Sequence, residues 1–102
     1  MIQDTFNCYA DVIASEMNIE TKEIFTRFKR RHLVDSRQVL FYLCSKSQMN
    51  VSYIQKFMEE SGLPMKHSTI IHGINRIDEL MSTNKPMQDF VKSVTSKIGE
   101  NV

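Results

Sequence analysis

The sequence predicts an all-α domain of about six helices, and three observations support this prediction. Apolar residues recur three, four and seven positions apart along most of the chain, which is the period of an amphipathic helix. No stretch of useful length alternates apolar and polar residues as a half-buried strand does. The 102 residues, 41% of them hydrophobic and 25% charged, suffice for one modest core. We therefore expect residues 1–102 to form a single domain.

The first helix is predicted over residues 3–17, and it is amphipathic. Its apolar face consists of Phe6, Ala10, Ile13 and Met17. Asn18 is expected to end this helix, and a short second helix is expected over about residues 20–27. The second helix is predicted to bury Ile24 together with Phe25 or Phe28.

A central, largely buried helix is predicted from a cap at Asp35 or Ser36 to about Lys46. Its wide apolar stripe consists of Val39, Leu40, Leu43 and Cys44. Cys44 and the other cysteine, Cys8, both lie inside apolar helical patterns. We therefore expect small buried hydrophobes at these two positions, not reactive thiols or a disulfide framework.

Two further helices with a break between them predict a helix-turn-helix. Asn50 is a good N-cap for a supporting helix that extends to residue 61, and Gly62 suits the C-terminal cap. Pro64 disfavours helical geometry in the residue before it and marks the break. The recognition helix is then predicted over residues 67–82, with a polar first turn. Its buried stripe consists of Ile70, Ile74, Ile77 and Met81.

A last helix is predicted after the recognition helix, because Pro86 fits a first helical turn. Its apolar residues, which follow the helical period, are Met87, Phe90, Val91, Val94 and Ile98. The seven methionines of the chain are expected to fill irregular gaps in the core.

The net charge is only +1, but the charge is unevenly distributed along the chain. Residues 1–21 carry −4, residues 22–76 carry +6 and residues 77–102 carry −1. Most of the cations in the segment from Arg27 to His32 must point to water or to phosphate, because they are too dense for one helical face to hide. A positive middle with acidic ends favours a phosphate-facing surface, although a solvated charged face is the common alternative.

Several other classes of function find little support in the sequence. Neither a membrane-spanning run nor a signal peptide is visible, so we expect a cytoplasmic protein. His67 and His72 are five residues apart and do not share a helical face as zinc ligands would, so no metal site is predicted. Ser68 beside His67 lacks a strained elbow and an acidic orienting group, so we expect no enzyme, no small-molecule substrate and no cofactor.

Four segments from about Val12 to Ile98 together resemble the C-terminal DNA-binding domain, domain IV, of the DnaA replication initiator family. They are IETKEIFTRFKRRHLV, DSRQVLFYL, NVSYI and HSTIIHGINRI, and the last is similar to the family signature His-Thr/Ser-Thr-Val-x-His-Ala. The resemblance implies a helical domain of Trp-repressor-like class. It also implies double-stranded DNA as the partner. The helix-turn-helix would lie in the major groove, and the segment of cations that begins at Arg27, here called the basic loop, would lie in the minor groove.

The resemblance assigns DNA contacts to particular residues. Lys29 occupies the position of the family's minor-groove arginine and is followed by Arg30 and Arg31, and Arg37 matches an arginine that contacts the DNA backbone. The recognition helix contributes His67, Ser68 and Thr69 to base edges and phosphates, and Ile71 to a thymine methyl group. Lys66, immediately before them, completes the predicted DNA-binding set.

Three departures from the family limit what the resemblance implies, and one of them is a connection from Ile54 to His67 that is about four residues longer than in the family. Pro64-Met65-Lys66 stands where the family signature has Gly-Arg-Asp, so the family's own site is not expected to be bound in the same way. The chain has no phosphate-binding GxxxxGK[ST] and is too short for the family's ATPase module. We therefore expect a stand-alone DNA-binding regulator of replication or transcription, as a phage or mobile element could encode. The alternative is an adaptor that binds a replication or transcription protein through the same fold.

Overall fold

The computed structural model describes residues 2–100, and every regular element in this range is a helix. The elements are α1 (Ile2–Met17), α2 (Thr21–Ile24), α3 (Arg31–Lys46), α4 (Val51–Glu60), α5 (His67–Thr83) and α6 (Lys85–Glu100). The predicted all-α class with about six helices is thus confirmed over the described range. None of these helices combines the length and apolar character that crossing a membrane requires.

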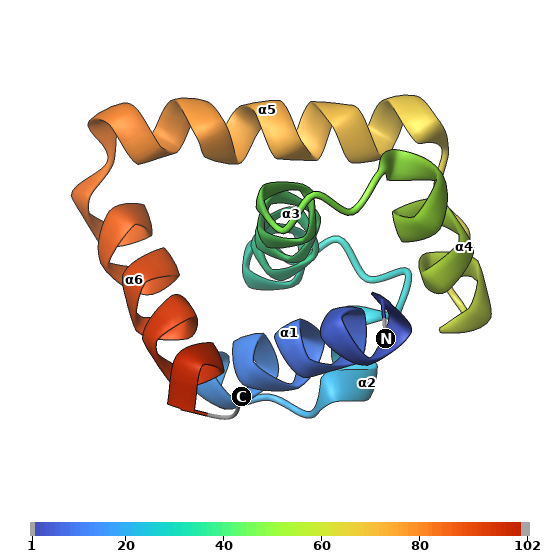
Figure 1. Cartoon of the computed structure of the whole chain (residues 1–102), viewed down its shortest axis with the longest axis horizontal. Coiled ribbons are helices and arrows are strands. Elements are labelled where there is room, and N and C mark those ends of the chain that lie inside the picture. The colour runs from blue at the N-terminus through green and yellow to red at the C-terminus, as the bar shows by residue number, and fades with distance from the viewer. Residues whose placement is uncertain (1, 101–102) are drawn as a thin grey trace.

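Helix α3 forms the centre of the domain. In Figure 1 it is seen nearly end-on, with α5, α6, α1 and α4 arranged around it. The predicted apolar stripe of Val39, Leu40, Leu43 and Cys44 is buried, as is Phe41. The surrounding helices contribute fully buried side chains to the same core, including Phe6, Ile13, Ile54, Ile70, Ile77 and Val94. Burial of each large apolar side chain is worth about 1.5–3 kcal/mol, so the position of α5 on α3 is set by its buried stripe.

Several helix ends predicted from the sequence are confirmed. Asn18 ends α1 in the left-handed conformation, with φ +58°. The Asn50 side chain accepts a hydrogen bond of 3.0 Å from the Tyr53 N–H and caps α4. Gly62, with φ +100°, follows the last turn of α4, where a side chain would be strained. Pro86 is the second residue of α6, in its first turn.

The start of α3 differs from the prediction, because it lies at Arg31 and not at Asp35 or Ser36. Both polar side chains have other partners. The Ser36 hydroxyl donates to the Leu33 carbonyl within the helix, and the Asp35 carboxylate accepts from Arg76 of α5. Arg31 and His32 therefore belong to the first turn of α3 and not to the loop before it.

The second helix is also shorter than predicted. Helix α2 covers only Thr21–Ile24, and the following residues form an irregular loop to Arg30. Ile24 is fully buried and Phe25 packs against Phe6, with ring centroids 6.0 Å apart. Phe28, the other candidate for burial, is instead 65% exposed.

Candidate nucleic-acid interface

The turn between α4 and α5 is fixed by two contacts. The Gln55 side chain of α4 donates a hydrogen bond of 3.0 Å from Nε2 to the Met65 carbonyl, just before α5 begins. Leu63, in the middle of the connection, is buried in the core. These contacts fix the first turn of α5 relative to α4, so the two helices form the predicted helix-turn-helix.

The first turn of α5 is polar and fully open to solvent. Lys66, His67, Ser68 and Thr69 are all exposed, and Ile70 directly after them is fully buried. Ile71 is 39% exposed and extends the open face by an apolar side chain. The predicted division of this helix into a polar tip and a buried body is confirmed.

The N-terminus of α5 also favours negative charge. Lys66 is the N-cap residue, and its side chain does not accept a bond from the first-turn amides as Ser or Asp would. The amides of His67, Ser68 and Thr69 precede the first residue with an intrahelical partner, Ile70, whose N–H donates to the Lys66 carbonyl. The helix dipole, the Lys66 ammonium and these amides together attract an anionic group.

The basic loop and the first turn of α5 border one groove. A cavity of about 250 Å³ is lined by Lys29 from the loop, Met65 from the connection between α4 and α5, and Thr69 from the first turn of α5. Its remaining lining comes from Val34, Arg37, Gln38 and Phe41 of α3. Lys29, Arg30 and Arg31 are exposed. The structure therefore brings Lys29 and Thr69, 40 positions apart in the sequence, to the same groove.

Arg37 is placed differently from the other predicted site residues, because only 5% of it is exposed. Its Nε donates to the Ile24 carbonyl at 2.7 Å, and its Nη2 donates to the carbonyls of Phe28, at 2.8 Å, and of Thr26. Burial lowers the pKa of Arg37 from its ordinary value, because desolvation disfavours the charged guanidinium. Arg37 thus holds the basic loop from the inside, and its predicted contact with the DNA backbone stays a prediction.

The body of α5 is tied to α3 by a polar cluster and by a close approach. Arg76 Nη1 donates to Asp35 Oδ1 at 2.7 Å and to Gln38 Oε1 at 2.5 Å. At Gly73 a Cβ atom would lie 3.0 Å from Gln38 Cγ and 3.2 Å from Phe41 Cδ2, so a glycine permits the observed distance between the helices.

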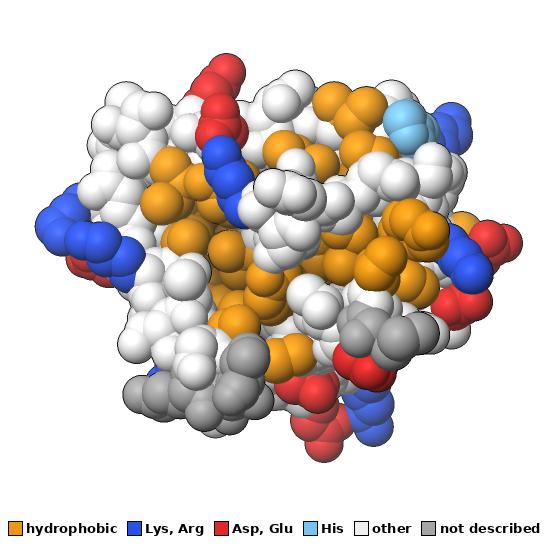
Figure 2. Space-filling model, viewed as in Figure 1, with side chains coloured by type: hydrophobic (Ala, Val, Ile, Leu, Met, Phe, Trp, Pro, Cys, Tyr) orange, Lys and Arg blue, Asp and Glu red, His pale blue; other side chains and the backbone are white. Residues whose placement is uncertain are grey.

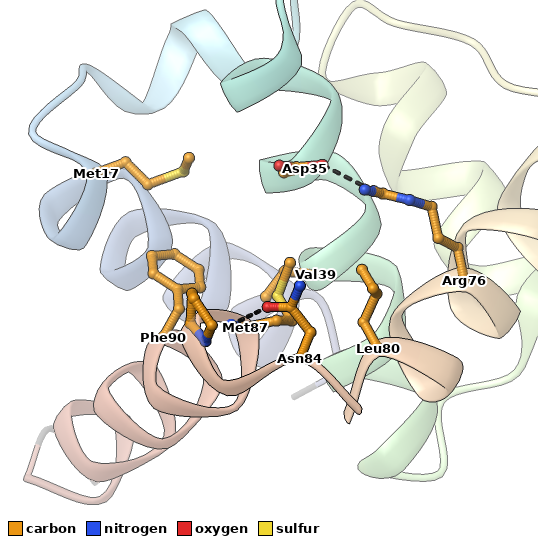
Figure 3. A pocket seen from close by; sticks show the side chains of 9 residues that line it. Met17, Asp35, Val39, Arg76, Leu80, Asn84, Met87 and Phe90 are labelled. Atoms are coloured by element: carbon orange, nitrogen blue, oxygen red, sulfur yellow. Dashed lines mark hydrogen bonds and ion pairs between the residues drawn. The ribbon is translucent and has the colours of Figure 1, made fainter. Parts of the chain in front are cut away.

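The same Asp35–Arg76 pair borders a second cavity of about 300 Å³, between α1, α3, α5 and α6 (Figure 3). Apolar side chains such as Met17, Leu80 and Phe90 line it beside the ion pair. Because α5 contributes Arg76 and Leu80 to this cavity, it lies about two turns or more along the helix from Thr69.

The space-filling view of Figure 2 shows the face on which α3 is seen end-on. Apolar side chains gather in the middle of this face, and the Lys and Arg side chains stand apart around its margin. Over the part drawn in colour, the positive charge on this face is therefore scattered. In the groove between the loop and the start of α5, by contrast, the exposed cation Lys29 lies beside Thr69 of the recognition helix.

Two exposed residues near the helix-turn-helix are absent from the predicted set. Lys56 of α4 lines a further groove of about 310 Å³ together with Gln55, Pro64 and Met65. The helical period of α4 indicates that Lys56 is exposed, but not that the turn lies beside it. Phe28 is the other residue, and its sequence signal is an apolar side chain within a run of cations.

Comparison with known proteins identifies the family. The model described as "Bacterial dnaA protein helix-turn-helix" matches residues 10–77, a range that includes every predicted DNA-binding residue. The chromosomal replication initiator protein DnaA of Lachnoclostridium phytofermentans is 25% identical over 95 residues, which are 92% of this chain and 20% of that protein. DnaA of Sulfurimonas denitrificans is 26% identical over 94 residues, covering 92% of this chain and 21% of the relative.

DnaA of Corynebacterium jeikeium is 28% identical over 88 residues, which cover 86% of this chain and 15% of that protein. The chain thus spans about a fifth or less of the length of these relatives. Because the family model covers two thirds of its residues, the chain belongs to the bacterial DnaA helix-turn-helix family.

Proposed function

We propose that this member of the bacterial DnaA helix-turn-helix family binds double-stranded DNA, with α5 in the major groove and the basic loop on the backbone and in the minor groove. The observation that carries the proposal is the shared groove of Lys29 and Thr69 beside the exposed first turn of α5. When the N-terminal turn of a helix enters the major groove, the cations beside that turn come close to the phosphates that border the groove.

The first turn of α5 supplies the groups that contact bases. His67, Ser68 and Thr69 offer short donors and acceptors to base edges or phosphates, and Ile71 offers an apolar contact to a thymine methyl group. Lys66 adds a positive charge at the helix N-terminus. This combination favours a target that differs from one read by an aspartate at the same place.

The basic loop and the first residue of α3 supply affinity. Lys29, Arg30 and Arg31 are exposed, and the buried Arg37 holds the main chain of the loop in one conformation. A loop that is ordered before binding loses less conformational entropy in the complex. Phosphate contacts of this kind are independent of base sequence and depend strongly on salt.

We assign the chain a role in regulating replication or transcription through the DNA site that it occupies. The relatives are named as initiators of chromosomal replication, and duplex DNA is the partner that the family supports. No catalytic step and no cofactor enters this proposal. The alternative is an adaptor, in which the same surface contacts a replication or transcription protein.

Titration of labelled random duplexes with the purified 102-residue chain at several salt concentrations tests the proposal. With Lys29, Arg30, Arg31 and Lys66 on phosphates, the slope of log K against log salt should be about −3 to −4. Selection of bound duplexes from a random pool should then yield a preferred site. Absence of binding at low salt would contradict the proposal and favour the adaptor.

A matched pair of variants separates the groove from general charge. Lys29→Ala should weaken binding and make the salt slope shallower by about one unit. Lys92→Ala removes a cation that is also exposed but lies on α6, which does not line the groove, and should leave both quantities unchanged. Equal losses in the two variants would count against the proposed docking geometry.

A further inference from the structure

Phe28 is the most exposed of the large hydrophobic residues described in the structure. Its exposed fraction is 65%, against 45% for Ile2, 41% for Tyr53 and 39% for Ile71. An aromatic ring held in water is unfavourable, because its apolar surface orders or displaces solvent without any compensating contact. Single exposed apolar residues are common on protein surfaces, so the significance of this ring depends on how the fold holds it and on its neighbours.

The exposure of Phe28 is built into the fold. Its carbonyl accepts a hydrogen bond of 2.8 Å from Nη2 of the buried Arg37, which also bonds the carbonyls of Ile24 and Thr26. Phe25, three residues earlier, occupies the place against Phe6 in the core. The backbone on both sides of the ring is thus fixed, and the ring projects from a loop that is ordered before binding.

The neighbours of Phe28 identify the kind of partner. Arg27, Lys29 and Arg30 are all exposed, so the ring lies within a run of cations. An apolar protein surface would have to desolvate these charges, which is costly. Duplex DNA presents phosphates to the cations, and a base step that opens in the minor groove exposes apolar base faces to the ring, so it matches both features.

The position of Phe28 relative to the recognition helix agrees with this partner. Lys29, the next residue, lines the groove that Thr69 of α5 also lines. In the proposed docking, the first turn of α5 lies in the major groove and the loop lies on the backbone and in the adjacent minor groove. In the minor groove, apolar side chains act on DNA by entering between base pairs and partly unstacking them.

We propose that Phe28 is a wedge that enters the minor groove beside the site read by α5, unstacks one base step there and bends the duplex. This inference rests on the proposed DNA binding and adds a specificity determinant that makes no hydrogen bond to a base. Pyrimidine–purine steps such as TA and CA/TG open most readily, so Phe28 should favour such a step at the flank of the site.

The test uses duplexes that carry the selected site and differ only at the flank, with a TA step in one set and a stiff A-tract in the other. Affinity is measured together with end-to-end energy transfer, which reports bending, and with the fluorescence of 2-aminopurine at the flank, which reports unstacking. The proteins are the full chain, Phe28→Ala, Phe28→Trp and, as control, Ile71→Ala.

For the full chain we expect preference for the flexible flank, a bent duplex and bright 2-aminopurine. Phe28→Ala should lose about tenfold in affinity for the flexible duplex and abolish both optical signals, with the salt slope unchanged. Phe28→Trp should retain them, because it keeps an aromatic ring. Ile71→Ala should alter affinity without removing the bend or the flank preference.

Two results would overturn the wedge while leaving DNA binding intact. One is a Phe28→Ala variant that keeps the bend and the flank preference of the full chain. The other is a loss of affinity in Phe28→Ala that is equal for the duplexes with the two flanks. If the full chain binds no duplex at low salt, the proposed function itself fails and the wedge fails with it.

Thermal unfolding of Phe28→Ala should match that of the full chain, since the ring is exposed.

Discussion

Arg76 Nη1 lies 2.7 Å from Asp35 Oδ1, and this ion pair ties the recognition helix to the central helix at a half-buried position. The same nitrogen also donates to Gln38, so one guanidinium connects α5 to two side chains of α3. The cluster lies far enough from the exposed turn of α5 that its removal should affect stability more than it affects individual DNA contacts.

Arg76→Ala should therefore lower the free energy of unfolding by about 1–2 kcal/mol, because it leaves the half-buried Asp35 carboxylate with only a weak partner. Arg31 lies 3.9 Å from that carboxylate and is too exposed to replace the lost bond. Urea unfolding measures the effect. Lys85→Ala is the control, since it breaks an exposed ion pair with Asp89 and should cost less than about 0.5 kcal/mol. Equal effects would show that burial of the Arg76 pair adds nothing.

Arg37→Met should both destabilise the domain and loosen the basic loop. The variant keeps most of the apolar volume but leaves the carbonyls of Ile24, Thr26 and Phe28 without their donors, at a cost of about 2–4 kcal/mol. Hydrogen exchange of residues 25–30 should accelerate more than that of α5 or α6. Uniform acceleration over the whole chain would mean that Arg37 supports the core and not the loop in particular.

Gly73→Ala and Gly99→Ala should differ in sign. Alanine improves helix propensity by about 1 kcal/mol at an unhindered position, and nothing lies within 4 Å of a Cβ at Gly99. At Gly73 the new methyl group meets Phe41, which is 1% exposed, and Gln38, which is bonded to Arg76. We expect Gly73→Ala to destabilise by about 1 kcal/mol in thermal unfolding. A stabilised Gly73→Ala variant would show that α5 can move away from α3 at little cost.

The buried thiol of Cys44 should make the free energy of unfolding decrease at alkaline pH. Burial raises the pKa of its thiol from 9.0 to about 12, so the thiol stays neutral in the folded state while it ionises in the unfolded state. Above pH 9 the folded state therefore binds more protons than the unfolded state. The contribution of the buried thiol to the free energy of unfolding is complete below pH 9 and is lost progressively as pH rises from 9 toward 12.

Between pH 7 and pH 10 the loss should be on the order of 1 kcal/mol, and it should be missing from the pH profile of Cys44→Ala. Denaturant unfolding at the two pH values measures it. Parallel profiles for the two proteins would contradict the assigned burial. Alkylation at pH 8 offers an independent check, since Cys44 should react only when the domain unfolds.

Changes at the tip of α5 and in the loop should have different effects on DNA recognition. Lys66→Asp and His67→Ala alter groups beside the bases, so we expect a changed preference in a selection from random duplexes. Lys29→Ala and Arg30→Ala remove phosphate contacts, so they should weaken binding to all sequences by similar factors. If all four variants keep the binding profile of the full chain, the docking geometry is wrong.

The regular helices could be predicted from the sequence because their buried faces follow a simple period. The predicted range 3–17 differs from α1 by one residue at its start, and the predicted range 67–82 differs from α5 by one residue at its end. Helix caps such as Asn50 and Gly62 could also be predicted from the sequence, because each cap acts within a few residues of its own position. The groove that Lys29 and Thr69 share was not predicted, because the resemblance to the family implied only that both residues contact DNA.

What could not be predicted depends on partners far away in the sequence. Asp35 has the chemistry of a helix cap, but it is paired with Arg76, 41 positions later, and α3 begins earlier. Arg37 has the chemistry of a phosphate contact, but the loop before it offers carbonyls that bury its guanidinium. A periodic pattern indicates which face is apolar, and it does not indicate which polar group a given side chain meets.

Arg37 holds the basic loop through main-chain carbonyl oxygens, which every amino acid supplies. The shape of the loop is therefore largely uncoupled from the side chains that it displays. We therefore expect the loop to keep its conformation when Arg27, Phe28, Lys29 or Arg30 is replaced. Because Arg37 fixes the main chain of the loop, substitutions in the loop could change its DNA preference without changing the rest of the domain.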